Sequence, residues 1–156
     1  MIEIAVPGRE PFQITSVVLD YNGTIAVDGK IPMELKPLLV KLRKLLPVFV
    51  LTADTYGSAR AQCEPLGLQV RTFPQENAAV CKEEIVRELG GKNVACLGNG
   101  FNDISMFQAA GLGIAVLDGE GLCTSLLPHA AVLCRSSAEA LALLLNPKRV
   151  IADLRS

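Results

Sequence analysis

An alternation of short apolar runs with stretches of helical periodicity constrains the fold of this chain more than any other feature. Six runs rich in β-branched residues are predicted strands, over residues 16–19, 48–51, 68–73, 94–97, 112–116 and 131–133. Helical spacing of apolar residues predicts helices over residues 34–46, 56–66, 78–89 and 136–145. Strands that alternate with helices are typical of a parallel α/β sheet with both faces covered.

The two ends of the chain lie outside this pattern. Residues 2–6 and 12–15 predict an opening hairpin around Pro7-Gly8-Arg9-Glu10, which we expect to extend a sheet edge. Ser136-Ser137-Ala138-Glu139 predicts a capping box for a helix that Asn146-Pro147 ends, with a turn or short helix after it. A length of 156 residues suits one domain, with the hairpin in 1–15, the core in 16–146 and a tail in 147–156.

Composition excludes several classes of protein. Half of the residues are hydrophobic, which argues against global disorder, and a net charge of -1 gives no field that attracts nucleic acid or an anionic membrane. The apolar segments are too short for a membrane span, and no basic region precedes an apolar stretch at the start of the chain. We therefore expect a soluble, cytoplasmic protein with neither nucleic acid nor membrane as a partner.

The cysteines do not suggest a metal site or a nucleophile. Five are present, an odd number without any Cys-x-x-Cys pair, and His129 is the single histidine. We expect the cysteines to be small buried hydrophobic residues in a reducing compartment, and His129 to lie at a loop end.

Polar residues follow three of the predicted strands. They are Asp20-Tyr21-Asn22-Gly23-Thr24, Thr52-Ala53-Asp54 and Gly98-Asn99-Gly100-Phe101-Asn102-Asp103. Because ligands bind beyond the carboxyl ends of strands in open α/β sheets, we expect these segments to meet at one edge. Taken singly, the first could be a turn and the second a helix cap. The third lacks the last glycine of a dinucleotide-binding fingerprint.

Lys82 adds a positive charge to this group. It falls on the core-facing stripe of the 78–89 helix, together with Ala78, Ile85 and Leu89. A lysine in this position either snorkels to solvent or is buried beside a negative charge. Asp20 or a bound anion is the expected partner.

Together these segments resemble the haloacid dehalogenase superfamily of phosphoryl-transfer enzymes. The likeness is greatest to the phosphorylation domain of P-type ATPases and to small soluble proteins like it. It covers roughly residues 16–116, including Gly98–Met106 and Ala109–Val116. The resemblance implies a Rossmann-like three-layer αβα sandwich and a phosphatase or phosphoanhydride hydrolase.

The resemblance also implies roles for single residues. Asp20 would be the nucleophile that forms an aspartyl-phosphate, and Gly23, Thr52, Ala53 and Lys82 would bind the phosphoryl group. A carboxylate attacks a phosphate only if a metal ion and a cation such as lysine neutralise the repulsion between them.

A magnesium ion is the implied cofactor. Asp20, Asn22, Asn99 and Asp103 would hold it, Asn22 through its backbone carbonyl, and such an oxygen-rich set suits Mg²⁺.

Two positions depart from the family pattern. Asn22 stands where phosphatases of the family usually carry an aspartate as general acid and base, and Asn99 stands where they usually carry a metal-binding aspartate. The alternative to an enzyme is thus a regulatory or assembly module that keeps the fold and the phosphate pocket with little turnover.

The spacing of the motifs leaves no room for a large cap domain. The 31 residues between Asp20 and Thr52 allow a small flap, with Asp28-Gly29 as its turn, and one helix. An uncapped site would act on a small phosphorylated substrate or a phosphoprotein, or be covered by another subunit of a homo-oligomer.

Overall fold

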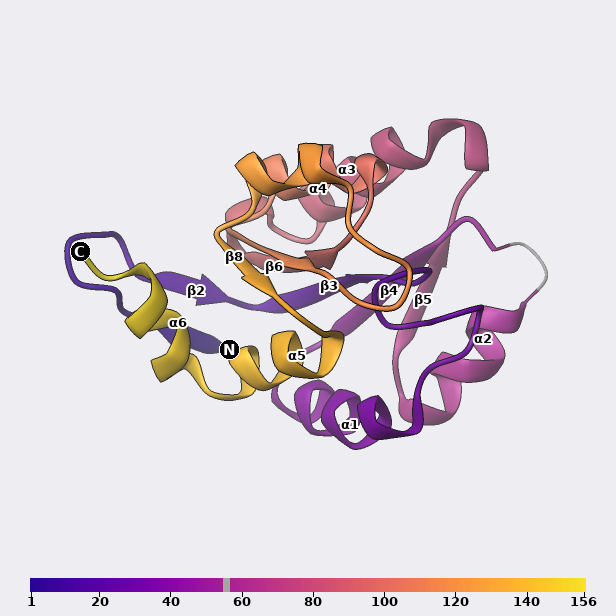
Figure 1. The fold of residues 1–156 in the computed structure, drawn as a ribbon, viewed down its shortest axis with the longest axis horizontal. Helices are drawn as coiled ribbons and strands as arrows, with labels where there is room; N and C mark the ends of the chain where they lie inside the picture. Colours follow the sequence, from indigo (N-terminus) through magenta and orange to yellow (C-terminus); the bar gives the residue numbers. More distant parts are fainter. Residues whose placement is uncertain (55–56) are drawn as a thin grey trace.

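A parallel sheet of six strands lies at the centre of the computed structural model, which describes residues 1–54 and 57–156 (Figure 1). The strand order is β5-β4-β3-β6-β7-β8, and every neighbouring pair is parallel. The strands are β3 (Ser16–Asp20), β4 (Val48–Thr52), β5 (Gln69–Thr72), β6 (Val94–Gly98), β7 (Leu112–Val116) and β8 (Val132–Cys134). The predicted parallel sheet is confirmed.

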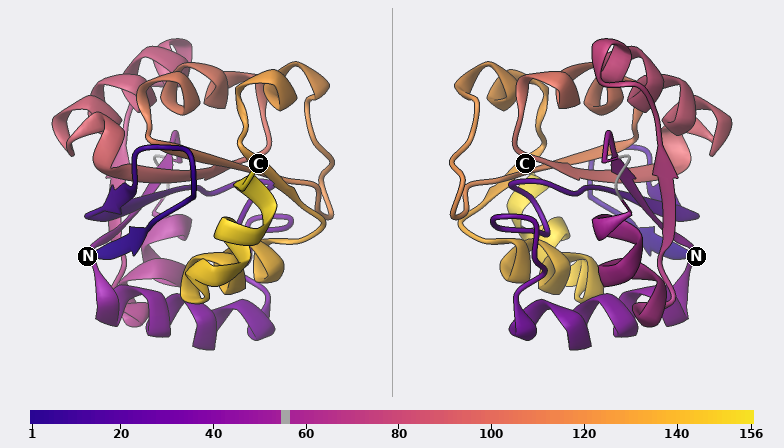
Figure 2. Two further views of the ribbon diagram at one scale, coloured as in Figure 1. Left: turned by 90° about the vertical axis from the view of Figure 1, so that its left-hand side faces the viewer. Right: turned by 90° about the vertical axis from the view of Figure 1, so that its right-hand side faces the viewer.

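Helices cover both faces of this sheet, as the two side views also show (Figure 2). One face carries α3 (Ala78–Glu88) and α4 (Ile104–Ala109); the other carries α1 (Lys36–Leu45), α2 (Ser58–Cys63) and α5 (Ser137–Leu145). Short 3-10 helices are η1 (Met33–Leu35), η2 (Glu64–Leu66), η3 (Gln75–Asn77), η4 (Gly91–Asn93), η5 (Phe101–Asp103) and η6 (Thr124–His129). The three-layer αβα sandwich is therefore confirmed. Among the described residues, no helix combines the length and apolar character needed to cross a membrane.

The core is divided by the sheet into two apolar clusters. Side chains alternate along each strand, so Val17 and Leu19 of β3 face the α1 and α5 side while Val18 faces α3 and α4. Every residue of β3, β4, β6 and β7 is buried. Strands with both faces covered explain why the sequence carries continuous apolar runs there.

The hairpin prediction is correct in its pairing and wrong in its place. β1 (Ile2–Ile4) and β2 (Phe12–Ile14) pair antiparallel, but they form a sheet of their own and do not extend an edge of the large one. One residue, Thr15, joins β2 to β3, which is a central strand with neighbours on both sides. The hairpin thus projects beyond the start of β3, where β1 contacts the last helix, α6 (Pro147–Leu154).

Local signals near the chain's turns and caps are borne out in part. Asp28 and Gly29 both have positive φ, at 51° and 78°, as the predicted two-residue turn requires. The Ser136 hydroxyl accepts from the backbone N–H of Glu139 at 3.1 Å, but the Glu139 carboxylate binds Arg135, so only half of the capping box forms. Tyr56, part of the second helical pattern, lies outside the described residues.

The cysteines behave as their sequence pattern predicts. Within residues 1–54 and 57–156 all five are free thiols; Cys63, Cys96 and Cys134 are buried, and the other two are half-buried. Burial raises the pKa of Cys63 to about 12 and that of Cys134 to about 11, so these thiols stay protonated at neutral pH. His129 ends η6, partly exposed.

Candidate active site

The polar segments named above converge where the strand order reverses. β3 carries Asp20 at its carboxyl end and pairs with β4 on one side and β6 on the other. After β3 the chain continues to β4 on one side, and after β6 it continues to β7 on the other side. The carboxyl ends of β3, β4 and β6 therefore form the crevice in which α/β sheets bind ligands. The expectation that the three segments meet at one edge is confirmed.

Lys82 lies between two carboxylates in this crevice. Its Nζ is 2.7 Å from Oδ1 of Asp20, 2.7 Å from Oδ1 of Asp103 and 3.0 Å from Oδ1 of Asn102. The three charged residues are buried, with exposed fractions of 3% for Lys82, 7% for Asp20 and 0% for Asp103. The expected pairing of Lys82 with Asp20 is confirmed, and Asp103 is a second partner.

Burial and this charge cluster alter the acidity of the groups. Burial, and after it the nearby Asp103 carboxylate, raise the pKa of Asp20 to about 7, against the lowering effects of Lys82 and Thr24. For Lys82, burial alone would lower the pKa, but the Asp20 and Asp103 carboxylates outweigh it and hold the pKa above its usual value. Lys82 therefore remains a cation at neutral pH, while Asp20 gains or loses its proton near pH 7.

Both carboxylate oxygens of Asp103 accept hydrogen bonds. While its Oδ1 pairs with Lys82, its Oδ2 accepts the backbone N–H groups of Asn99 at 3.1 Å and Gly100 at 3.0 Å. Asp103 is also not among the residues that line the hollow above Asp20. The direct ligation of a metal ion by Asp103, which the resemblance implies, stays a prediction.

Thr24 connects the two expected metal ligands on either side of it. Its hydroxyl lies 3.1 Å from Oδ2 of Asp20 and 3.3 Å from Oδ1 of Asn99. The Asn99 amide donates from Nδ2 to the carbonyl of Gly121 at 3.1 Å, which leaves its Oδ1 for the Thr24 hydroxyl. One hydroxyl proton serves only one of the two oxygens at a time, so the pair has unused acceptor capacity.

The acceptor pair formed by the Asp20 and Asn99 oxygens fits a metal ion. A hard divalent cation is bound by carboxylate, carbonyl and amide oxygens, and the Asp20 and Asn99 oxygens converge as such a pair. Among the described residues no cluster of three His, Cys, Asp or Glu side chains suits a metal. The donor set therefore fits a cation such as Mg²⁺ with little negative charge, which predicts weak binding.

Gly23 shapes the loop without contacting the hollow. Its φ is 80°, and a Cβ at this position would lie 2.3 Å from Nδ2 of Asn99. Its backbone N–H donates to the carbonyl of Ala26 at 2.8 Å. The resemblance places Gly23 at the phosphate, but here its N–H is occupied, and glycine is needed for the backbone conformation and for the close approach of Asn99.

A buried network supports the loop that follows Asp20. The Ser137 hydroxyl donates to the backbone carbonyl of Thr24 and lies 3.2 Å from Oδ2 of Asp118. The same Asp118 oxygen accepts the backbone N–H of Ser137 at 3.0 Å. Ser137 is fully buried at the start of α5, so this helix fixes the loop that carries Thr24.

A hollow of about 330 Å³ opens above these residues. Its lining includes most of the predicted site residues as well as Gln75 and Asn102; the full set is Asp20, Asn22, Thr52, Ala53, Phe73, Gln75, Ala78, Lys82, Asn99, Gly100 and Asn102. The hydroxyl of Thr52 accepts the backbone N–H of Asp54 at 3.1 Å, which orients it at the end of β4. An anion in the hollow would therefore lie near a hydroxyl, an ammonium group and a carboxylate.

Sequence reasoning missed several residues that the structure adds to the site. Asn102 and Thr24 lie inside the quoted motifs, and their polar side chains beside predicted ligands were a usable signal. Ser137 and Asp118 lie far along the chain, in segments where a cap and a loop explain the residue types. No local pattern could have connected them with Thr24.

Comparisons with known proteins agree with this geometry. A family model described as haloacid dehalogenase-like hydrolase matches residues 84–139. The phospholipid-transporting ATPase NEO1 of Saccharomyces cerevisiae is 39% identical over 62 residues, 40% of this chain and 5% of that protein. The chain thus spans a small part of this relative. An uncharacterized protein of Methanocaldococcus jannaschii is 34% identical over 73 residues, 47% of this chain and 78% of that protein.

Solved structures show the same fold at low sequence identity. The 3-deoxy-D-manno-octulosonate 8-phosphate phosphatase of Moraxella catarrhalis, a complex with magnesium, phosphate and sugar, has a TM-score of 0.72 at 15% identity. The similarity covers 90% of both chains. From the matched family model and the sequence relatives, we conclude that this chain belongs to the haloacid dehalogenase superfamily.

Proposed function

We propose that the protein is an uncapped, Mg²⁺-dependent phosphohydrolase that transfers a phosphoryl group to Asp20. The observation that carries this proposal is the Asp20 carboxylate itself, held at 2.7 Å from Lys82 at the floor of a polar hollow at the sheet's switch point. The phosphatase of Moraxella catarrhalis, with the same fold, holds magnesium and phosphate, which supports the assignment by analogy.

The side chains suggest how the reaction would proceed. A phosphate dianion above Asp20 would lie near the Lys82 ammonium and the Thr52 hydroxyl, with the backbone of Ala53 at its side. An oxygen of Asp20 would attack phosphorus while the leaving oxygen departs, giving an aspartyl-phosphate. Water would then attack the same phosphorus, release phosphate and restore the carboxylate.

Asp20 and Asn99 would hold the metal ion. The carbonyl of Asn22 would complete the set of protein oxygens, and the bound cation would reduce the repulsion between the carboxylate and the phosphate. Asp103 would act by holding Lys82 and the loop at Asn99 in place. Asn99→Asp adds a negative ligand, so we expect tighter Mg²⁺ binding in a calorimetric titration; an unchanged affinity would argue against this metal position.

Asn22 limits the expected rate. It is exposed at the edge of the hollow, where an aspartate would exchange protons with the leaving group and with water. An amide cannot do so, and general acid and base catalysis is worth about 10²–10⁴ in rate. We therefore expect slow turnover and an aspartyl-phosphate that persists.

The same residue supports the second candidate, a phosphate-binding regulatory module with little turnover. Steady-state phosphate release from several phosphoesters at saturating Mg²⁺ separates the two functions. For an enzyme, Asn22→Asp raises release by about tenfold or more, and Asp20→Asn abolishes it in both backgrounds. If Asn22→Asp stays at the level of the Asp20→Asn control, the regulatory function is favoured.

A further inference from the structure

The two edges of the large sheet differ in charge. β5 and β8 are its outermost strands, and within residues 1–54 and 57–156 each of them has a strand neighbour on one side only. β5 carries the exposed Arg71, whereas β8 carries no charged residue. A charge on an edge strand discourages pairing with another chain, for which the unpaired backbone N–H and C=O groups of the edge are otherwise a template. β8 has no such charge.

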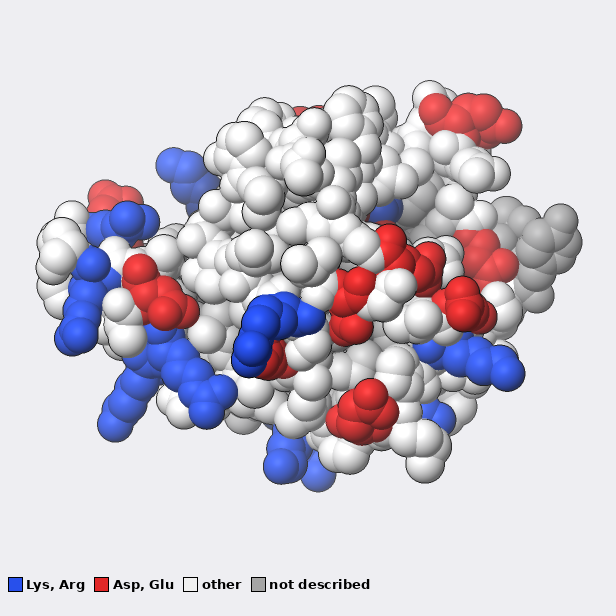
Figure 3. All heavy atoms as spheres, in the orientation of Figure 1, with Lys and Arg blue, Asp and Glu red and all other residues white. Residues whose placement is uncertain are grey.

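The surface around β8 is also uncharged. No Asp, Glu, Lys or Arg occurs in residues 121–134, which include η6 and β8, and α4 contains none either. Every other described helix contains at least one such residue. β8 lies in the foreground of Figure 1, and the surface above it, over α4 and η6, is almost free of the red and blue side chains that Figure 3 shows elsewhere. We call the surface of α4, η6, β8 and Leu117 the β8 face.

Three leucines are exposed on the β8 face. Leu117, Leu127 and Leu133 have exposed fractions of 47%, 38% and 48%. Ala115 of β7 pairs with Leu133, and Leu117 lies two residues after Ala115, so both leucines project from the same side of the sheet. The buried side chain of η6 belongs to the same apolar cluster as Ala115, so Leu127 is exposed on this side as well. Apolar side chains beside an unpaired strand indicate an interaction surface.

From these observations we infer that β8 pairs antiparallel with β8 of a second copy of this chain, and that the leucines of the two β8 faces pack together. A two-fold axis joins identical surfaces. On a charged surface it brings like charges together, which is unfavourable, whereas the uncharged β8 face meets its own copy without repulsion. A strand of three residues provides few backbone hydrogen bonds, so the leucines supply much of the buried area that a stable interface needs.

The nearest charge is compatible with this pairing. Arg135 follows β8 directly and is exposed. In an antiparallel pair centred on Leu133, Arg135 lies opposite Ala131 of the partner subunit, because each residue is matched with one equally far on the other side of the centre. The two arginines are therefore at opposite ends of the paired strands, and only leucine faces its own copy at the axis.

The β8 face is separate from the hollow above Asp20. None of the residues that line this hollow belongs to α4, η6 or β8, and Leu117 is not among them. The inferred dimer therefore does not depend on the proposed function, and either can fail without the other.

Sedimentation of the full chain at micromolar concentrations tests the inference. We expect a particle of twice the mass of the chain that dissociates on dilution. Leu133→Lys should raise the dissociation constant at least about a hundredfold, because the axis places the two lysines opposite each other. The matched control Gln69→Lys puts the same charge on an exposed position of β5 and should leave the constant within about twofold. A wild-type monomer, or a dimer that Leu133→Lys leaves unchanged, would overturn the inference.

A mixing experiment tests whether residue 133 faces its own copy. Leu133→Lys and Leu133→Glu should each be monomeric alone and should form a dimer when mixed, because opposite charges then face each other across the strands. Both variants should keep any Asp20-dependent phosphate release, since Leu133 does not line the hollow. A mixture that stays monomeric, while each variant still unfolds cooperatively in urea, would overturn the inference.

Discussion

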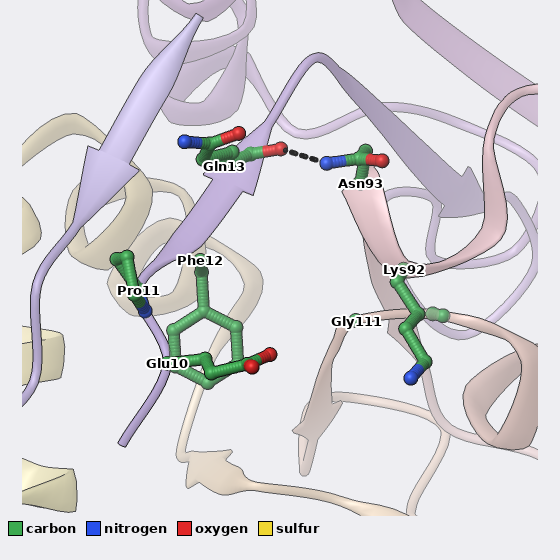
Figure 4. A pocket seen from close by; sticks show the side chains of 8 residues that line it. Glu10, Pro11, Phe12, Gln13, Lys92, Asn93 and Gly111 are labelled. Carbon is green, nitrogen blue, oxygen red and sulfur yellow. Dashed lines mark hydrogen bonds between the residues drawn. The ribbon is translucent and has the colours of Figure 1, made fainter. Parts of the chain in front are cut away.

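Two hollows of nearly equal volume lie at opposite ends of the sheet, and each has a lysine and an acidic residue in its wall. The first, above Asp20, measures about 330 Å³; the other, about 320 Å³, lies between the hairpin and the turn at Lys92. In the hollow near Lys92, Glu10 and Phe12 come from the hairpin side and Lys92 lies on the opposite wall (Figure 4). Lys92 and Glu10 are exposed, whereas Lys82 and Asp20 are buried.

The volume of the hollow does not distinguish the two ends of the sheet, whereas the burial of the charged side chains does. At the amino ends of the strands, Glu10 and Lys92 are exposed to water and come from separate segments of the chain. At the carboxyl ends of the strands, Lys82, Asp20 and Asp103 are buried against one another, which costs desolvation free energy. Burial and the Asp103 carboxylate raise the pKa of Asp20; burial opposes a raised pKa at Lys82, but the two carboxylates outweigh it. Buried charge of this kind is typical of functional sites, and it is the reason we propose the active site at this end of the sheet.

The largest expected difference comes from removing each lysine. Lys82→Met leaves two buried carboxylates side by side, so we expect a loss of about 3–5 kcal/mol in the free energy of unfolding and at least about a hundredfold loss of phosphate release. Lys92→Met removes an exposed charge and should change stability by less than about 0.5 kcal/mol. Urea unfolding of both variants measures this, and similar losses would refute the contrast.

The next effect is a dependence of stability on pH. The folded-state pKa of Asp20, about 7, lies above its ordinary value of 3.8, so the folded protein holds this proton more tightly than the unfolded chain. Its contribution to stability is therefore greatest at low pH and falls as pH rises from about 4 to about 7, by up to about 1.4 kcal/mol per unit. Urea unfolding of the metal-free protein between pH 5 and 8 should show this slope, and Asp20→Asn should flatten it. The same slope in both proteins would remove Asp20 as its cause.

A smaller effect is expected where α5 supports the loop that carries Thr24. Ser137→Ala removes the hydrogen bond to the Thr24 carbonyl and should cost about 1–3 kcal/mol, with phosphate release lowered about tenfold and Ser137→Thr restoring part of it. Ser136→Ala is a matched control on the same helix, because it removes the cap and should cost about 1 kcal/mol with release unchanged. Equal effects of the two serines on release would show that helix stability alone matters.

The smallest effect is expected in the hollow at the amino ends of the strands. Glu10→Gln removes the exposed acidic charge from the hollow in Figure 4 and should change neither phosphate release nor stability by a measurable amount, within about 0.5 kcal/mol. A loss of phosphate release would mean that this hollow contributes to function.

Much of the arrangement around Asp20 can be predicted from the sequence, because the patterns that indicate it are local. Lys82 lies on an apolar helical stripe, which indicates burial, whereas Lys92 follows Gly90-Gly91 in a turn and carries no such pattern. Asp20 is the last residue of a buried strand, which places it at the carboxyl ends of the strands. These patterns depend on a few neighbouring residues, so they can be read without the fold.

Contacts between distant segments could not be predicted in this way. The Ser137 contact with Thr24 joins residues 113 positions apart, and the serine's place at a helix start already accounts for its identity. The hairpin's position depends on the strand order, because only a central β3 prevents β2 from reaching an edge. The double use of Asp103, toward Lys82 and toward two backbone N–H groups, likewise requires the folded loop.

Direct detection of a phosphorylated aspartate tests the central claim that the buried Asp20 is a nucleophile. The wild-type protein is mixed with Mg²⁺ and glucose 6-phosphate or acetyl phosphate, quenched in acid and examined by peptide mass spectrometry. We expect a phosphoryl adduct on Asp20 that accumulates in the wild type, is depleted in Asn22→Asp and is absent in Asp20→Asn. Phosphate release without an adduct on Asp20, or an adduct that persists in Asp20→Asn, would contradict the account.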